Sequence, residues 1–150
     1  MPEVFPIIPA SQKAFWFLYG IAGLLLVLGV ALVYVGWGAN HASCEISPAG
    51  LRISGDLFGR TIPGHALIVE GARALDLAAE KDYQPRWRTL GTAVPGYQSG
   101  WFRLRNGEKA LLFLTHHGRV VYVPTRDGYS LMLSVADPDA FLHALARNAS

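Results

Sequence analysis

Residues 101–114, with the sequence WFRLRNGEKALLFL, decide the fold class of this chain. Residues 101–105 alternate apolar and basic side chains, and residues 110–114 are apolar. Asn106 and Gly107 lie between these two runs. Asn-Gly between apolar runs is the strongest short-range hairpin signal, because both residues tolerate the positive φ angles of a type I′ turn. The stretch therefore predicts two antiparallel strands joined by a tight turn.

Short apolar runs separated by turn residues continue on both sides of this hairpin, a pattern typical of a small sandwich or barrel. The turn Pro48-Ala49-Gly50 predicts a second hairpin near the start of the region. Further strands are expected at residues 44–47, 51–54, 60–63, 67–69, 72–77, 119–124 and 129–135. The two strands of the central hairpin and the last two strands are expected to form a four-stranded meander, in which each strand pairs with the next one along the chain.

Near the C-terminus the spacing of the apolar residues becomes that of an α-helix. Asp137 has the character of an N-cap, Pro138 suits the first helical position, and Phe141, Leu142 and Leu145 form one apolar face. An amphipathic helix with such a face is expected to cover the open end of a small sheet.

The segment 80–100 fits neither period well, because it mixes aromatic and basic residues with two prolines and three glycines. Two structures are open for it. One is a long irregular loop, which in a compact domain is often functional. The other is a strand through residues 86–88, followed by a rigid turn at Pro95-Gly96.

The apolar excess of the composition is concentrated near the N-terminus. Hydrophobic residues make up 51% of the chain and charged residues only 16%, against about 25% charged in soluble proteins. Residues 14–39 form 26 consecutive positions without a charged side chain, with aromatic residues at both ends. About 20 such residues cross a bilayer as a helix, and the run is too long for a signal peptide. We expect a tail at 1–13, a transmembrane helix at 14–39 and a β domain at 42–148.

The flanking charges set the expected orientation. Lys13 precedes the apolar run, whereas no Lys or Arg follows it before Arg52. The positive-inside rule then favours a single-pass protein with its N-terminus in the cytoplasm and its β domain outside.

This order of elements resembles the bacterial pleckstrin-homology (PH) domain proteins that carry one N-terminal membrane span. The likeness covers residues 42–147 and is carried by three stretches: CEISPAGLRISGDLFGRTIP at 44–63, PRWRTLGTAVPGYQSGWFRLRNGEKALLFL at 85–114, and VVYVPTRDGYSLMLSVADPDAFLHAL at 120–145. The resemblance implies a mainly β fold, a PH-like partly open barrel with one C-terminal α-helix, anchored in the bacterial inner membrane by the preceding helix.

Eukaryotic proteins of this fold bind phosphoinositides through Lys and Arg residues clustered in the first hairpin loop. The corresponding loop here is Pro48-Ala49-Gly50, which carries no charge. The resemblance therefore does not extend to phosphoinositide binding at this loop.

No group of residues points to an enzyme. The histidines lack metal-ligand spacing, His116 and His117 fall in an expected turn, and no phosphate-binding glycine loop is present. We expect no catalytic residue, no metal site and no cofactor.

Cys44 is the single cysteine. The stretch 40–44 loosely resembles a lipoprotein cleavage site, although His41 stands where an aliphatic residue is usual. Cys44 is therefore either lipidated or a free thiol at the start of the first strand.

Basic residues alternate with aromatic and apolar ones on two expected strands. If these strands are neighbours, their guanidinium groups flank Trp87 or Trp101 and suit carboxylate or phosphate; otherwise they form a solvated outer face. The candidate binding residues are Arg86, Trp87, Arg88, Tyr97, Trp101, Arg103 and Arg105. The net charge of only +2 argues against nucleic acid as a partner.

Two functions agree with these features. The first is a non-catalytic, membrane-anchored protein-interaction module, bound to the bilayer through one transmembrane helix and to a protein partner through its β domain. The alternative is binding of an anionic ligand or lipid headgroup by the arginine and aromatic residues.

Overall fold

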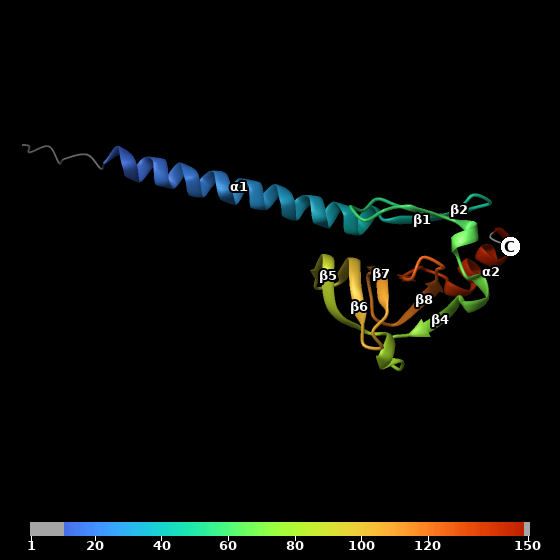
Figure 1. Cartoon of the computed structure of the whole chain (residues 1–150). Helices are drawn as coiled ribbons and strands as arrows, with labels where there is room; N and C mark the ends of the chain where they lie inside the picture. The colour runs from blue at the N-terminus through green and yellow to red at the C-terminus, as the bar shows by residue number, and fades with distance from the viewer. Residues whose placement is uncertain (1–10, 149–150) are drawn as a thin grey trace, which may run out of the picture. The chain divides into compact units, whose positions relative to one another are not determined.

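The computed structural model describes residues 11–148 (Figure 1). Contacts divide the chain into two compact units that meet between Trp37 and Gly38. The described residues contain two α-helices, nine strands in two open sheets and three short 3₁₀ turns. This mainly β architecture, with an apolar N-terminal helix and a C-terminal helix, confirms the predicted fold class.

Helix α1 spans Gln12–His41, and its segment Gln12–Trp37 is long and apolar enough to cross a membrane, with a mean hydropathy of 2.4. Apart from the half-buried Val35, the residues of this segment are exposed on all sides of the helix. At 1.5 Å per residue the segment is about 39 Å long, more than the roughly 30 Å hydrocarbon core of a bilayer. A helix that is apolar all round is typical of a membrane span.

The smaller sheet consists of β1 (Ser43–Ser47), β2 (Gly50–Ser54) and β3 (Thr61–Pro63), all antiparallel and in that order. The hairpin predicted around Pro48-Ala49 forms between β1 and β2, with Ser47 opposite Gly50. Alternate residues of this sheet point inward, so Leu51, Ile53 and Ile62 are buried.

The strand predicted at residues 67–69 is wrong. The 3₁₀ turn Gly64–Ala66 ends just before this run, the turn Val69–Gly71 includes its last residue, and Leu67 makes only an isolated bridge to Thr125. Only two residues remain between the turns, which is too few for a regular ladder. The next strand, β4 (Arg73–Asp76), forms within the expected stretch 72–77.

The larger sheet has the strand order β4-β8-β9-β7-β6-β5. Its remaining strands are β5 (Pro85–Val94), β6 (Tyr97–Leu104), β7 (Lys109–Leu114), β8 (Arg119–Pro124) and β9 (Ser130–Leu133). The hairpin predicted from residues 101–114 is the β6–β7 pair. Its turn is not of type I′, because Gly107 has a positive φ and Asn106 does not.

The predicted meander is wrong, because β9 lies between β7 and β8. It pairs parallel with β7 and antiparallel with β8. All four residues of β9 are buried. A strand with no exposed residue is best accommodated with a neighbour on each edge, and a place at the end of a meander would leave one edge open.

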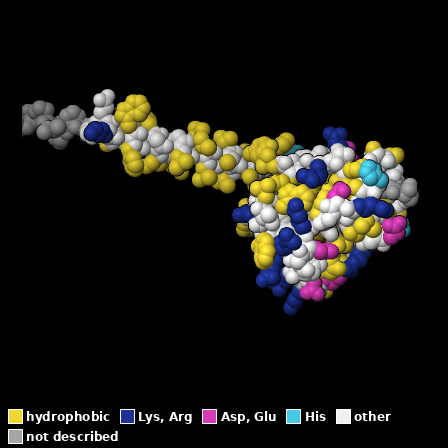
Figure 2. Space-filling model, viewed as in Figure 1, with side chains coloured by type: hydrophobic (Ala, Val, Ile, Leu, Met, Phe, Trp, Pro, Cys, Tyr) yellow, Lys and Arg dark blue, Asp and Glu magenta, His cyan; other side chains and the backbone are white. Residues whose placement is uncertain are grey.

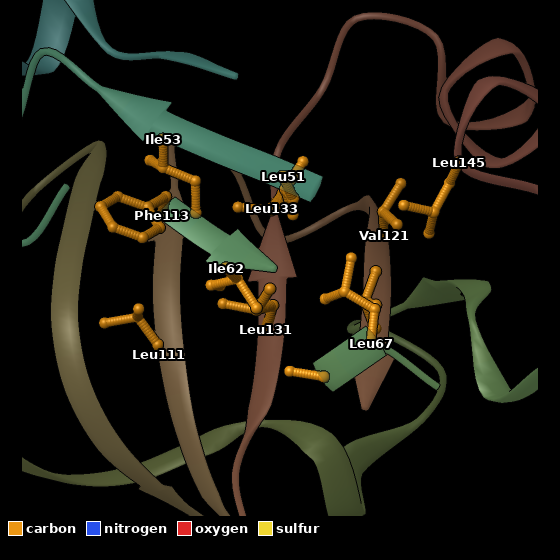
Figure 3. Packing of buried hydrophobic residues seen from close by; sticks show 12 residues of the cluster. Leu51, Ile53, Ile62, Leu67, Leu111, Phe113, Val121, Leu131, Leu133 and Leu145 are labelled. Atoms are coloured by element: carbon orange, nitrogen blue, oxygen red, sulfur yellow. The ribbon is translucent and has the colours of Figure 1, made fainter. Parts of the chain in front are cut away.

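Apolar residues pack on both faces of the larger sheet. One cluster joins this sheet to the smaller sheet and to helix α2 (Pro138–Asn148), and Figure 3 shows Leu145 of α2 pointing toward Val121. The other cluster includes Phe102, Leu112 and Met132. Helix α2 begins as predicted, because the Ala140 N–H donates to Asp137 Oδ1 at 3.0 Å.

The glycine pair Gly91 and Gly100, opposite each other in β5 and β6, gives a test of the fold. A Cβ on Gly100 would lie 2.6 Å from the Gly91 Cα and 2.5 Å from the Leu90 oxygen, at a φ of +110°. We expect Gly100→Ala to lower the free energy of unfolding by about 2–4 kcal/mol through this clash and backbone strain. Thermal unfolding of the full chain in detergent, followed by near-UV circular dichroism, measures it.

Gly118→Ala is the matched control, since its Cβ would meet nothing closer than the His116 Nδ1 at 3.7 Å. Its effect is expected to stay within about 0.5 kcal/mol. Equal effects of the two substitutions would show that β5 and β6 do not approach as described.

Candidate binding surface

Strands β5 and β6 bring most of the predicted binding residues together. Residues 85–94 form a ten-residue strand, so the open choice between a loop and a strand is settled in favour of the strand. In its register with β6, Trp87 lies opposite Arg103 and Arg88 lies opposite Phe102. Cross-strand partners share a face of the sheet.

Simple alternation predicts that each of these strands presents its arginines on one face. The irregular pairing of β5 with β6 changes this arrangement. The register shifts between Pro85 and Trp87 and again between Arg88 and Leu90. Arg88 consequently shares a face with the buried Phe102, whereas Arg103 shares the opposite face with Trp87. The basic residues of the two strands therefore lie around the end of the sheet rather than on one face.

The side chains at this end of β5 and β6 line two shallow hollows. Pro85, Arg86 and Arg105 line a hollow of about 380 Å³. Arg86, Trp87 and Arg88 line a second, of about 330 Å³, together with Gln98 and Phe102. We call Arg86, Trp87, Arg88 and Arg105 the arginine surface. In Figure 2, several Lys and Arg side chains gather on the side of the domain where β5 and β6 lie.

Trp87 is the exposed aromatic group of the arginine surface. Its side chain is 53% exposed, and the Arg86 guanidinium carbon lies 4.9 Å from its ring centroid. An arginine stacked on an exposed indole keeps its N–H groups available for an anion while the ring provides apolar contact area. The surface can thus receive a carboxylate or phosphate beside an apolar group.

Trp101 lies in a separate cluster. Its half-buried ring has the Arg60 guanidinium carbon 5.0 Å and the Lys109 ammonium nitrogen 4.4 Å from the centroid, and Tyr129 packs edge-on at 5.0 Å. Arg103 and Lys109, which are opposite each other, line a hollow of about 360 Å³ beside Tyr129. Trp101 and Arg103 therefore belong to this cluster rather than to the arginine surface.

The sequence reasoning missed Arg60, Lys109 and Tyr129. Lys109 could not be found from the predicted hairpin, because a two-residue turn at Asn106-Gly107 would place it opposite Leu104, whereas the structure places it opposite Arg103. Arg60 could not be found either, since it belongs to the smaller sheet and reaches Trp101 only through the packing of the two sheets.

Tyr97, the remaining predicted residue, is buried away from the arginine surface. Its hydroxyl donates a hydrogen bond to Asp56. Burial and the Asp56 carboxylate raise the pKa of Tyr97 to about 12, against a smaller opposing effect of the Ser99 hydroxyl. A neutral tyrosine that joins β6 to the loop after β2 has a structural role.

Cys44 borders a cleft of about 370 Å³. Apolar side chains dominate its walls, among them Ile53, Phe113, Leu133 and Phe141. Burial, and to a smaller extent the neighbouring Glu45, raise the pKa of Cys44 to about 12. The thiol is therefore protonated at neutral pH and a poor nucleophile.

Within residues 11–148, no three His, Cys, Asp or Glu side chains come together in a way that could hold a metal ion. The arginine surface offers only donors and cations, which suits binding of an anion.

Comparison with known families identifies the fold. The family model described as "Bacterial PH domain" matches residues 74–149, which is half of the chain. The chain belongs to the bacterial PH domain family. The match begins at residue 74, within β4, and includes the rest of the larger sheet of this PH domain, its arginine surface and α2. Searches of curated proteins and of solved structures gave no match.

The raised pKa of Cys44 predicts slow alkylation of the folded PH domain. A shift from 9.0 to about 12 lowers the thiolate fraction at pH 8 by about a thousandfold. We expect maleimide to label the native full chain about a thousandfold more slowly than the urea-unfolded chain at pH 8. Mass spectrometry of the labelled chain measures the two rates.

The same experiment decides between the two states of Cys44 left open by the sequence. A lipidated thiol would not react even in urea, and a chain processed at this site would begin at Cys44 and carry the mass of a diacylglyceryl thioether. Labelling of the native chain within tenfold of the unfolded rate would contradict the burial of this thiol.

Proposed function

We propose that this bacterial PH domain is a non-catalytic protein-interaction module, held at the bacterial inner membrane by α1. The observation that carries the proposal is the arginine surface, where an exposed tryptophan lies between two exposed arginines at the edge of the larger sheet. PH domains are generally non-catalytic modules, which agrees with such a role.

The residue types of the arginine surface suit a protein partner. Trp and Arg are the residues most enriched at interface hot spots, since they combine apolar area with directional hydrogen bonding. Arg86 and Arg88 are exposed, and neither is among the ion pairs of residues 11–148, which are Arg73–Glu80 and Arg119–Asp139. The complementary partner is an acidic segment that also presents an apolar group to Trp87.

A specific observation also favours the second candidate, binding of an anionic ligand or lipid headgroup. Arg86 and Arg105 line the same hollow, although they are 19 positions apart in the sequence. Two guanidinium groups around one hollow can share a single phosphate through paired N–H donors. A phosphate-bearing headgroup is the lipid chemistry that fits this hollow.

The arrangement in the membrane is part of the proposal. We infer a tail at 1–13, a single span at 14–39 and a PH domain at 42–148 outside the cytoplasm. Residues 1–10 of the tail lie outside the described residues, and its last two residues belong to α1. The support is Lys13 before the apolar run and the absence of Lys or Arg between it and Arg52.

Replacement of Arg86 and Arg88 by alanine tests the arginine surface. A photo-crosslinker placed at Thr89, between these arginines and Leu90, is expected to give defined products with a different protein in bacterial membranes. The double substitution should reduce these products at least about tenfold, because each charge-assisted hydrogen bond contributes roughly 1.5–3 kcal/mol. Arg52→Ala combined with Arg126→Ala removes the same charge from other parts of the domain and should leave the products unchanged.

Vesicle binding separates the two candidates. The full chain in neutral-lipid nanodiscs is mixed with vesicles containing anionic phospholipid. Salt-sensitive binding that is lost with Arg86→Ala and Arg105→Ala would favour the headgroup function, whereas crosslinked protein without vesicle binding would favour the interaction module. If substitution of the arginines reduces neither the crosslinking nor the vesicle binding, both candidate functions are contradicted.

Reporter fusions after Ser150 test the orientation. Alkaline phosphatase, which is active only outside the cytoplasm, is expected to be active there, and green fluorescent protein is expected to be dark. The reverse pattern would place the PH domain in the cytoplasm and exclude partners outside it.

A further inference from the structure

The second half of β5 is an open sheet edge of unusual composition. Residues 90–94 pair with β6 in unbroken register, from Leu90 opposite Trp101 to Val94 opposite Tyr97. In the described part of the chain β5 has β6 as its one strand neighbour, so its other edge is unpaired. Leu90 is 62% exposed and Val94 40% exposed, and the run LGTAV carries no charge.

The two halves of β5 differ in how they resist pairing with another strand. Proteins protect sheet edges with charges, prolines and bulges. The first half has all three, in Arg86, Arg88, Pro85 and the two register shifts. The second half has none of them, and a regular apolar edge is a template for an added strand.

We propose that residues 90–94 of β5 pair antiparallel with the same residues of a second copy of this chain, centred on Thr92. Leu90, Thr92 and Val94 lie on one face of the sheet, since their partners in β6 are Trp101, Ser99 and Tyr97. About the centre at Thr92, Leu90 of each copy comes opposite Val94 of the other. The pairing is self-complementary, as a twofold interface requires, and it buries two exposed apolar residues in each copy.

Charge favours a second copy in this antiparallel register. Arg86 and Arg88 precede the paired segment, so the arginines of the two copies lie at opposite ends of the interface. Arg88 of one copy falls opposite Gly96 of the other, which carries no charge. A parallel pairing in register would instead place each arginine beside the same arginine of the second copy, and like charges directly opposite destabilise a sheet.

Disulfide trapping tests the register. In a Cys44→Ser background, Thr92→Cys provides one cysteine at the expected centre, where opposed Cα atoms are about 4.5–5.5 Å apart, within the range for a disulfide. Mild oxidation of the full chain in detergent should crosslink Thr92→Cys at least about tenfold faster than Leu57→Cys, an equally exposed control in the loop after β2. Arg86→Cys should also crosslink slowly, and fast crosslinking there would indicate parallel pairing and overturn the proposal.

Charge substitution tests the pairing without a covalent link. Leu90→Lys alone and Val94→Glu alone should convert a dimer to a monomer, measured by light scattering with detergent correction or by native mass spectrometry. The double variant Leu90→Lys/Val94→Glu should restore the dimer, because each introduced lysine then faces an introduced glutamate in the second copy. Near-UV circular dichroism of every variant verifies that the domain is folded.

Several outcomes would overturn the proposal. A wild-type chain that is monomeric at about 100 µM would do so, as would equal crosslinking at positions 92 and 57. A failure of the double variant to recover, with both single variants folded, would exclude this register. If Thr92→Cys crosslinks in membranes to a different protein while the chain remains monomeric, the edge receives a foreign strand and self-pairing is excluded. Binding of a single anion at the arginine surface, which uses other residues, would be unaffected by any of these results.

Discussion

Complete burial of β9 is the constraint on which the rest of the PH domain depends. Its four residues, Ser130–Leu133, are buried on both faces of the larger sheet, with Leu131 and Leu133 in one apolar cluster and Met132 in the other. Its two edges are occupied by β7 and β8. The polar member, Ser130, donates to the Tyr122 hydroxyl at 3.0 Å, and Tyr122 donates to Glu108 at 3.1 Å. Every side chain of this central strand is either packed or hydrogen-bonded. The strand contributes apolar residues to both clusters and so joins them into one domain.

The central position of β9 determines which strands form the edges of the larger sheet. With β9 flanked by β7 and β8, the strands that remain for the edges of the larger sheet are β4 and β5. Strand β4 is short and carries charge at both ends, in Arg73 and Asp76. Strand β5 is long, and its exposed side chains include Trp87 and Leu90. Of the two edge strands, β5 is therefore the one that presents exposed apolar side chains, and it lies in the part of the chain that the family model matches.

Local signals in the sequence predicted those parts of the structure that depend on neighbouring residues. The Asn-Gly turn fixed the β6–β7 hairpin, the Asp137 cap fixed the start of α2, and the uncharged run indicated α1. The place of β9 could not be predicted, because a parallel partner is set by the packing of both faces and not by a turn. The bulges in β5 were equally invisible, so Arg86, Arg88, Arg103 and Arg105 were expected on common faces. Arg60 reaches Trp101 only through sheet packing, and Lys109 reaches it because the β6–β7 register differs by one residue from that of a two-residue Asn106-Gly107 turn.

The two proposed interactions, pairing of residues 90–94 and binding at the arginine surface, are linked because both use β5. Antiparallel pairing of residues 90–94 leaves residues 85–88 outside the paired segment in both copies, because the bulges and arginines there resist a neighbouring strand. A dimer of this kind carries one arginine surface at each end of the interface. Once one surface is occupied, binding to the second becomes intramolecular for a ligand that presents two anionic groups, and avidity can exceed the affinity of either surface alone. A partner with repeated acidic segments, or a surface with many anionic groups, would therefore bind the dimer far better than the monomer, while a single anion would bind both equally.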